Sequence, residues 1–191
     1  MLTDKREKSL SKMMTKILRH APEKFGILLD EADGSCLLSE LLAAINRQPD
    51  WSSITEAHIL YVVERSSKQR FELADGRIRA RYGHSVQKVS YPAAVPPEIL
   101  YHGTNEAVVA AILREGIQAM GRQYCHLSEG LDFAALAGSR KGKLVMLEVD
   151  TQLAAEHGVI FYYAGNEVWL AEAIPAECCR IYDFPIEAGK S

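Results

Sequence analysis

The chain has 191 residues, of which 48% are hydrophobic and 25% are charged, as in an ordinary globular protein of one large or two small domains. No apolar run approaches the roughly 20 residues that a membrane-spanning helix needs, and the polar start MLTDKREKSLSK lacks the apolar stretch of a signal peptide. The four cysteines form no CxxC pair and the six histidines show no metal-ligand spacing. We therefore expect a cytoplasmic protein with no membrane segment, no disulfide framework and no metal.

The net charge of −3 conceals an asymmetry between the two halves of the chain. Residues 1–95 hold 15 Lys and Arg against 12 Asp and Glu, whereas residues 96–191 hold 7 against 13. Basic residues concentrate between Lys68 and Lys88, where the acidic residues are Glu72 and Asp75. This pattern indicates a polyanionic partner for the first half or a solvated surface of mixed charge, and charge alone does not decide between them.

The first region of the chain has a mainly helical pattern. Apolar residues at helical spacing predict the first helix: Leu10, Met13, Met14, Ile17 and Leu18. We expect Asp4 to cap this helix and Pro22 to end it. Ser39 and Thr55 are expected to cap a second and a third helix, with His58 completing a Thr-x-x-His start.

A β-hairpin is predicted after these helices. Residues 70–73 and 77–81 alternate in polarity and are joined by a turn at Asp75-Gly76. Three helices followed by a two-stranded wing is the winged-helix layout. Modules of this kind commonly bind nucleic acid, although a fold does not by itself establish a function.

Three prolines within residues 92–97 remove amide donors and hold the chain extended, so we expect a linker there, between domains at 1–91 and 98–191. The pattern of the second domain is mixed. Many short strands with two small helices indicate an α+β domain built on a split or antiparallel sheet. The expected strands lie at 99–101, 124–127, 144–149, 159–162, 168–170 and 180–182, and the expected helices at 106–114 and 132–137.

Two short basic motifs in the first domain could bind phosphate. Arg19 and His20 come where the first helix ends, and both side-chain types can donate to phosphate oxygens. Their alternative role is to oppose the negative end of the helix dipole. Arg70 stands in Lys-Gln-Arg-Phe at the start of the predicted hairpin, where basic residues are also common without any function.

Several motifs in the second domain carry groups that could bind a ligand. His102-Gly103-Thr104 follows a strand, and His and Thr can hydrogen-bond ribose hydroxyls while Gly permits close approach. Tyr124, His126 and Ser128 alternate, so they would share one strand face, which could equally be a polar edge. The amides of Gly138-Ser139-Arg140-Lys141-Gly142 could meet an anion or form a plain loop. Trp169 is expected to pack in the core.

Taken in order, these segments resemble the RNA 2′-phosphotransferase family, also called tRNA 2′-phosphotransferase. The matching segments are LRHAP, KQRFEL, YHGT, RQYCHLS, GSRKG, and NEVWL followed by IP, and they run from about residue 8 to residue 184. The resemblance implies an α+β protein of two lobes. One is a winged-helix-like RNA lobe, and the other is an ADP-ribosyltransferase-like NAD lobe with a split β-sheet.

The resemblance also implies a reaction that consumes NAD and needs no metal. The RNA 2′-phosphate attacks the nicotinamide-bearing ribose carbon and expels nicotinamide. The ribose 2″-hydroxyl then attacks the phosphorus, releasing 2′-hydroxyl RNA and ADP-ribose 1″,2″-cyclic phosphate. Such a family acts at RNA splice junctions, which implies a place in tRNA processing.

The family's catalytic set carries over to Arg19, His20, Arg70 and Arg122. The resemblance implies that Arg19 and Arg70 clamp the phosphate, and that His20 hydrogen-bonds it or transfers a proton. A shift in register would exchange Arg70 for Arg65, although the Lys-Gln-Arg-Phe frame favours Arg70.

Arg122 is expected to reach the phosphate from the NAD side, with Arg114 and Arg140 as nearby alternatives. Val168 stands where protein-modifying relatives carry a catalytic glutamate, and Glu167 replaces the family's usual glycine. The cofactor-binding residues implied by the resemblance are His102, Gly103, Thr104, His126, Ser128, Arg140 and Val168.

Two other functions remain open. An ADP-ribosyltransferase acting on another acceptor would share the NAD residues, but Glu167 would lie on the opposite strand face from Val168 by alternation and would be a poor substitute for the carboxylate. A winged-helix regulator that senses NAD without chemistry would explain the basic hairpin. We expect a monomer.

Overall fold

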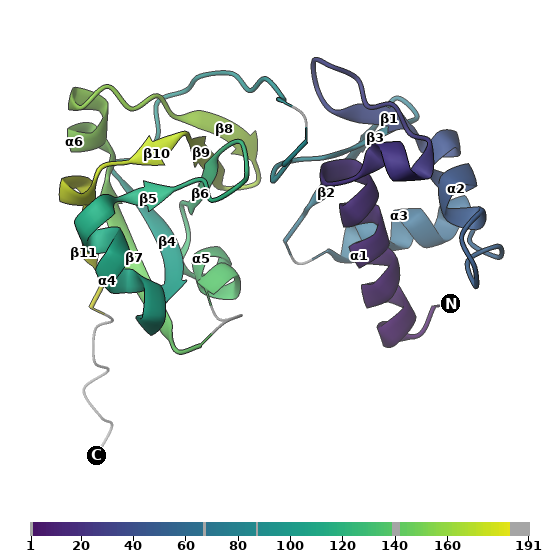
Figure 1. The fold of residues 1–191 in the computed structure, drawn as a ribbon, viewed down its shortest axis with the longest axis horizontal. Coiled ribbons are helices and arrows are strands. Elements are labelled where there is room, and N and C mark those ends of the chain that lie inside the picture. The colour runs from purple at the N-terminus through teal and green to yellow at the C-terminus, as the bar shows by residue number, and fades with distance from the viewer. Residues whose placement is uncertain (1, 67, 87, 139–141, 184–191) are drawn as a thin grey trace. The chain divides into compact units, whose positions relative to one another are not determined.

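The computed structural model describes residues 2–66, 68–86, 88–138 and 142–183 (Figure 1). The chain divides into two compact units. Unit 1 comprises residues 1–91 together with 121–123, and unit 2 comprises residues 92–120 and 124–191. Helices and antiparallel sheets occur together in the described chain, which confirms the predicted α+β class.

Unit 1 contains the three predicted helices, but two of their caps differ from the prediction. Thr3 rather than Asp4 is the N-cap of the first helix, and its Oγ1 accepts a hydrogen bond from the Arg6 amide at 3.4 Å. The second helix follows a strand directly, so its cap is Leu37 rather than Ser39. Thr55 caps the third helix, as predicted. The helices are α1 (Asp4–Arg19), α2 (Leu38–Asn46) and α3 (Glu56–Arg65), with a short 3-10 helix η1 (Pro22–Phe25) after α1.

The sheet of unit 1 has three strands rather than the predicted two. Strands β2 (Phe71–Ala74) and β3 (Arg77–Ala80) form the predicted hairpin around Asp75 and Gly76, which both have positive φ. Strand β1 (Ser35–Leu37) pairs antiparallel with β3 and was missed, because three residues carry too short a pattern to detect.

Unit 2 is built on a six-stranded antiparallel sheet in the order β11-β7-β4-β6-β9-β8, with a separate pair β10-β5. Most of the predicted strands are present, but the segment predicted at 159–162 begins only at Tyr162. The strands are β4 (Ile99–Asn105), β5 (Ile117–Gln118), β6 (Cys125–Ser128), β7 (Leu144–Asp150), β8 (Tyr162–Gly165), β9 (Val168–Ala171), β10 (Ala173–Ile174) and β11 (Cys179–Ile181).

Short helices accompany this sheet. Both predicted helices are present, and a third, which the sequence did not indicate, follows β7. They are α4 (Glu106–Glu115), α5 (Leu131–Gly138) and α6 (Thr151–Glu156), with the 3-10 helix η3 (Ala176–Cys178).

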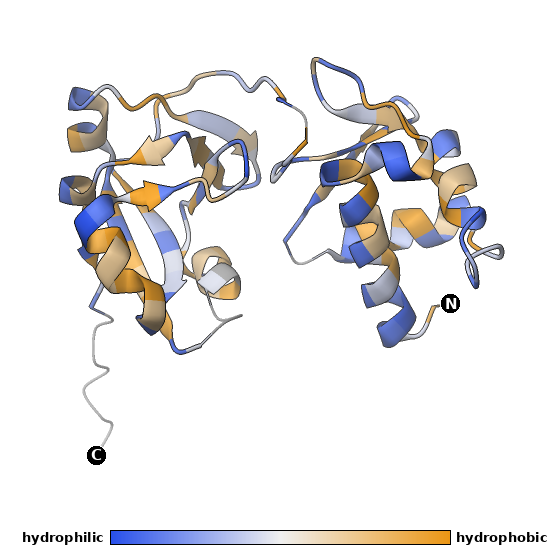
Figure 2. Ribbon diagram, in the orientation of Figure 1, coloured by the Kyte–Doolittle hydropathy of each residue, from blue (hydrophilic) through white to orange (hydrophobic). Residues whose placement is uncertain are grey.

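Each unit has its own hydrophobic core. The core of unit 1 joins the apolar faces of its three helices to Phe71 and Ile78 of the sheet, and α1 alternates between polar and apolar colour in Figure 2 as an amphipathic helix does. The core of unit 2 includes Leu100 and Trp169, so the predicted core position of Trp169 is confirmed. All four cysteines are free thiols. Among the described residues, no helix is long and apolar enough to cross a membrane.

Candidate active site

Arg19 is the last residue of α1, and its side chain is turned inward so that the residue is only 7% exposed. Its guanidinium carbon lies 5.0 Å from the centre of the Tyr82 ring. Within the described part of the chain, its Nε and Nη2 atoms are buried without a hydrogen-bond partner. Burial lowers the pKa of Arg19 to about 10, so it remains a cation at neutral pH. A buried cation with unused donors is the arrangement expected of an anion site.

Glycine is required next to Arg19. Gly83 has φ of +87°, a conformation that side chains rarely adopt, and a Cβ added there would lie 3.1 Å from Nη1 of Arg19. The turn at Gly83 therefore fits around the guanidinium group of Arg19.

His20 follows Arg19 and is exposed to solvent. Its Nδ1 lies 2.8 Å from Oγ of Ser85, and the Ser85 amide donates a hydrogen bond to the Arg19 carbonyl at 3.0 Å. Partial burial, followed by the charges of Arg19 and Arg122, lowers the pKa of His20 below its ordinary value. The ring is therefore neutral at neutral pH and can accept or donate a proton.

Arg70, rather than Arg65, is the arginine that lies beside Arg19. The charge of Arg70 is close enough to lower the pKa of Arg19, after burial itself. Arg65 is engaged elsewhere, because its Nε lies 3.5 Å from Oε2 of Glu7 and its guanidinium carbon lies 5.1 Å from the Tyr61 ring centre. Of the two arginines, Arg70 is therefore the one whose charge acts on Arg19.

Arg122 belongs to unit 1, although the sequence counted it with the domain at 98–191. The Gln123 side chain pairs with the backbone of Val89: its Nε2 donates to the Val89 carbonyl at 3.0 Å, and its Oε1 accepts from the Val89 amide at 2.8 Å. The Gln123 amide also donates to the His84 carbonyl at 3.2 Å. These contacts hold residues 121–123 on unit 1, where the charge of Arg122 lowers the pKa of both Arg19 and His20.

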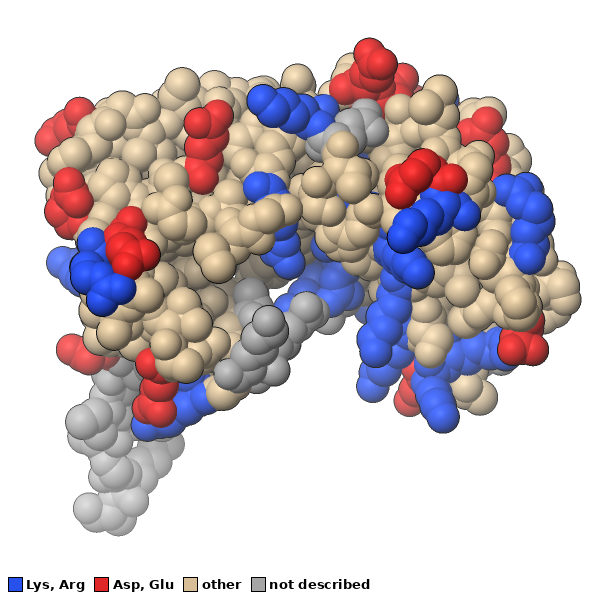
Figure 3. Space-filling view, in the orientation of Figure 1, with Lys and Arg blue, Asp and Glu red and all other residues tan. Residues whose placement is uncertain are grey.

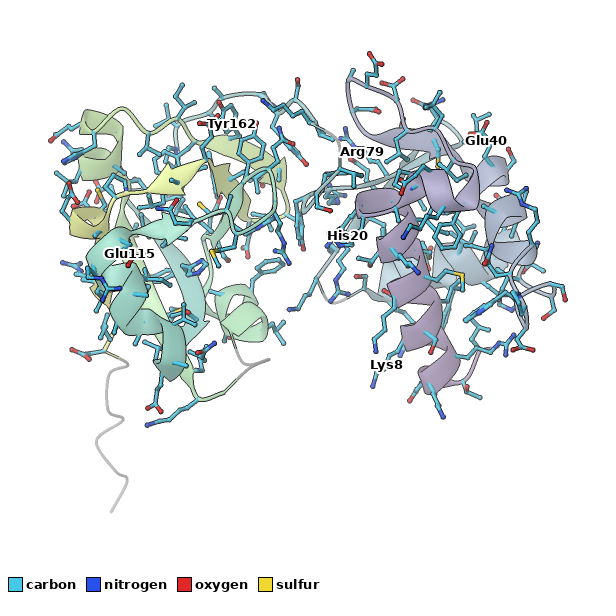
Figure 4. All side chains as sticks on the ribbon, viewed as in Figure 1. Lys8, His20, Glu40, Arg79, Glu115 and Tyr162 are labelled. Carbon is cyan, nitrogen blue, oxygen red and sulfur yellow. The ribbon has the colours of Figure 1, made fainter. Side chains whose placement is uncertain are left out.

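The four predicted catalytic residues thus gather in unit 1, and Figure 4 labels His20 at the end of α1. Like charges placed this close repel one another, which contributes to the lowered pKa values of Arg19 and His20. Of the alternatives to Arg122, Arg114 is paired with Glu115 in unit 2, and Arg140 lies outside the described residues.

His102 and His126 lie on the adjacent strands β4 and β6 of unit 2. Nδ1 of His102 lies 2.9 Å from the His126 carbonyl oxygen. Because a carbonyl only accepts, Nδ1 carries the proton and Nε2 is left as an acceptor. Burial lowers the pKa of His102, so the ring is neutral. This fixed tautomer is suited to accept a hydrogen bond from a hydroxyl group such as those of ribose.

The glycine next to His102 is required by packing. A Cβ on Gly103 would lie 1.8 Å from the carbonyl oxygen of Ala134 in α5, and one on Gly138 would lie 2.7 Å from the carbonyl carbon of Gly103. The backbone of α5 therefore occupies the space beside Gly103 in which a ligand was expected to approach the chain closely. Thr104, which follows in β4, is buried.

Ser128 links two strands that carry predicted NAD residues. It pairs with Tyr101 of β4 on one side and with Val168 of β9 on the other. Its Oγ donates to the Gly130 carbonyl at 2.8 Å and accepts from the Gly130 amide at 3.1 Å, which shapes the turn before α5. Val168 is fully buried. Glu167 lies in the turn before β9 with φ of +61°, so its placement on a strand face was wrong.

Comparison with known proteins identifies the family. The family model described as RNA 2′-phosphotransferase, Tpt1 / KptA family, matches residues 5–173. The chain belongs to the RNA 2′-phosphotransferase family. It is 40% identical over 90% of its length to the "Probable RNA 2′-phosphotransferase" of Acetivibrio thermocellus, covering 94% of that protein. The protein of the same name from Bacillus thuringiensis is 42% identical over 91% of this chain and 94% of its own, and that from Pyrococcus furiosus is 40% identical over 88% and 92%.

Three residues of this chain support the basic cluster and were not found from the sequence: Tyr82, His84 and Gln123. Tyr82 stacks on Arg19 and donates its hydroxyl to the Lys68 carbonyl at 2.7 Å. His84 is only 2% exposed, and burial, followed by the charges of Arg19, His20 and Arg79, lowers its pKa to about 4. Nothing local in the sequence marks them, because their partners are remote along the chain.

Within the described ranges, no group of three or more His, Cys, Asp or Glu residues is arranged to hold a metal ion. The predicted catalytic residues in unit 1 instead carry guanidinium and imidazole groups. Such groups bind phosphate oxygens directly.

Proposed function

We propose that the chain removes an internal 2′-phosphate from RNA with consumption of NAD. The observation that carries this proposal is the gathering of Arg19, His20, Arg70 and Arg122 in unit 1, with buried donors of Arg19 left unused. A 2′-phosphate carries nearly two negative charges and three acceptor oxygens, which complement such a set. Membership of the family supports the same substrate.

Unit 1 is proposed to be a winged-helix-like RNA lobe. Its order of α1, β1, α2, α3 and the β2-β3 hairpin, with a three-stranded antiparallel sheet, supports this assignment. Unit 2 is proposed to be the NAD lobe of the ADP-ribosyltransferase kind. The neutral His102, held by the His126 carbonyl on the adjacent strand, supports a role in binding the cofactor ribose.

In the proposed reaction NAD supplies the acceptor: its nicotinamide-bearing ribose carbon bonds to the 2′-phosphate as nicotinamide leaves, and its ribose 2″-hydroxyl then displaces the RNA as a 2′-hydroxyl. Arg19 and Arg70 hold the phosphate oxygens and stabilise the charge that spreads over them in the second displacement. His20, neutral at neutral pH, accepts the proton of the attacking hydroxyl or hydrogen-bonds the phosphate. Arg122 adds a further cation to the same phosphate.

The test is to incubate the protein with an RNA that carries one internal 2′-phosphate, with and without NAD, in the presence of EDTA. The expected result is NAD-dependent formation of 2′-hydroxyl RNA, nicotinamide and ADP-ribose 1″,2″-cyclic phosphate. Release of nicotinamide without loss of the RNA phosphate would contradict the proposal and favour an ADP-ribosyltransferase with another acceptor. RNA binding without any turnover would favour a regulator that senses NAD.

A further inference from the structure

A row of lysines runs along the exposed face of α1. Lys8, Lys12 and Lys16 follow one another at intervals of four residues, Lys5 precedes them at an interval of three, and His20 continues the row at the end of the helix. Residues at these intervals lie on one side of a helix, and each is about 4.5 Å (interval of three) or about 6 Å (interval of four) further along its axis. All five side chains are exposed. We call Lys5, Lys8, Lys12 and Lys16 the lysine row.

The lysine row is not explained by the stability of α1. Like charges at these intervals destabilise a helix by about 0.2–0.5 kcal/mol per pair. The helix dipole favours Lys16 in the last turn, and Lys16 also lies 5.6 Å from the Phe25 ring centre. The dipole does not favour Lys8 or Lys12, and it opposes Lys5 near the N-terminus.

No acidic side chain neutralises the lysine row in the described parts of the chain. The acidic residues of α1 are confined to its first turn, where Asp4 and Glu7 lie. Glu7 is paired with Arg65 on α3, and none of the ion pairs found among the described residues includes a member of the row. A merely solvated helix face usually mixes both signs of charge. In Figure 3 blue side chains gather over the part of unit 1 where α1 lies.

We propose that the lysine row binds the backbone phosphates of the RNA strand on one side of the modified nucleotide. The inference rests on the proposed function, which places the 2′-phosphate beside Arg19 and His20. Figure 4 labels Lys8 and His20 toward opposite ends of α1, and the helical rise separates them by about 18 Å. Steps of about 6 Å along this length suit successive phosphates of an extended single strand. The substrate is thus an RNA with several nucleotides on that side, not the 2′-phosphate alone.

The decisive variant is Lys8→Gln/Lys12→Gln/Lys16→Gln, because glutamine keeps helix propensity and removes charge. The matched control, Arg114→Gln/Lys143→Gln/Arg180→Gln, removes the same charge from exposed residues of unit 2. Turnover is measured with a 2′-phosphorylated dinucleotide and with longer RNAs extended on the 5′ or on the 3′ side. Fluorescence anisotropy measures binding of unmodified RNA, and thermal denaturation measures stability.

We expect the lysine variant to raise KM roughly tenfold for one of the extended RNAs at low salt. The plot of log binding constant against log salt should become less steep, its negative slope shrinking in size by about 2. KM for the dinucleotide, kcat and the control variant should stay unchanged, and the melting temperature should stay the same or rise. Equal KM for the extended RNAs before and after substitution, or an equal rise for the dinucleotide, would overturn the inference. If the wild-type chain turns over neither substrate, the proposed function fails, and the anisotropy measurement still decides whether the lysine row binds RNA.

Discussion

The two units differ in their buried polar groups. In unit 1 buried nitrogens of Arg19, Arg81 and His84 have no hydrogen-bond partner among the described residues, and in unit 2 the same holds for Nε2 of His126. In unit 2 Ser128 hydrogen-bonds to Gly130, and Trp169 Nε1 donates to Glu129 Oε1 at 2.8 Å. Groups left unsatisfied and cations placed together cost folding free energy unless a ligand offsets that cost. In unit 1 it is the buried Arg19 cation, with two unused donors, that favours binding of an anion.

The largest effect should come from Arg19→Met. Loss of one electrostatic contact to a reacting group typically slows catalysis about 100- to 1000-fold, and Arg19→Lys should not restore it, because lysine lacks the planar fork. Since the buried charge of Arg19 is unfavourable to folding, the melting temperature of Arg19→Met should stay the same or rise. Turnover of 2′-phosphorylated RNA and thermal denaturation measure the two effects. A variant that unfolds readily would show that Arg19 is needed for structure instead.

Gly103→Ala in unit 2 should lower the stability of the chain, whereas Arg19→Met in unit 1 should not. The added Cβ would lie 1.8 Å from the Ala134 carbonyl oxygen, so α5 must move away from β4. We expect a loss of about 3 kcal/mol in the free energy of unfolding, typical of overpacking at a rigid contact, measured by denaturant titration. Gly130→Ala is the matched control in unit 2, since Gly130, like Gly103, has no left-handed φ and a Cβ there would come no closer than 3.4 Å, to Oε2 of Glu167. A Gly103→Ala protein of unchanged stability would contradict the packing between α5 and β4.

His84 should make unit 1 sensitive to acid. Its pKa is about 4 in the folded chain and about 6.5 when unfolded, so the unfolded state takes up the proton first as the pH falls. Its contribution is complete above pH 6.5 and is lost down to about pH 4, a loss of about 3 kcal/mol. His84→Gln should show a shallower fall in unfolding free energy over this range than the wild type. Equal slopes would show that His84 is not held neutral in the folded protein.

Sequence patterns predicted what depends on near neighbours along the chain. The Thr55 cap, whose amide donates to Nδ1 of His58 at 3.2 Å, and the turn at Asp75-Gly76 are both local and were found. Strands β1, β5 and β10 have two or three residues and exist through remote pairing, so no pattern revealed them. The placement of Arg122 on unit 1 depends on hydrogen bonds between Gln123 and a residue 34 positions away, which the sequence does not disclose.

The segment that carries Arg122 offers a sharper test of the basic cluster. Gln123→Ala removes both side-chain hydrogen bonds to Val89, so Arg122 loses its fixed position. We expect about a tenfold fall in kcat, because one catalytic contact is misplaced. The free energy of unfolding should change little, because each lost hydrogen bond contributes modestly to it. If Gln123 acts through Arg122, adding Gln123→Ala to Arg122→Ala should cause no further loss. Additive effects in the double variant would show that Gln123 acts independently.

The smallest effect concerns a turn of unit 2 in which two successive non-glycine residues have positive φ. Asn166 and Glu167 have φ of +52° and +61°, which suits a glycine at the second position. Glu167→Gly should raise the free energy of unfolding by about 1 kcal/mol, because relief of the left-handed conformation exceeds the added flexibility of the unfolded chain. Denaturant titration measures the change, and Glu167→Gln is the control that removes the charge while keeping the strain. If Glu167→Gln stabilises the chain as much as Glu167→Gly does, charge rather than backbone conformation is what disfavours Glu167.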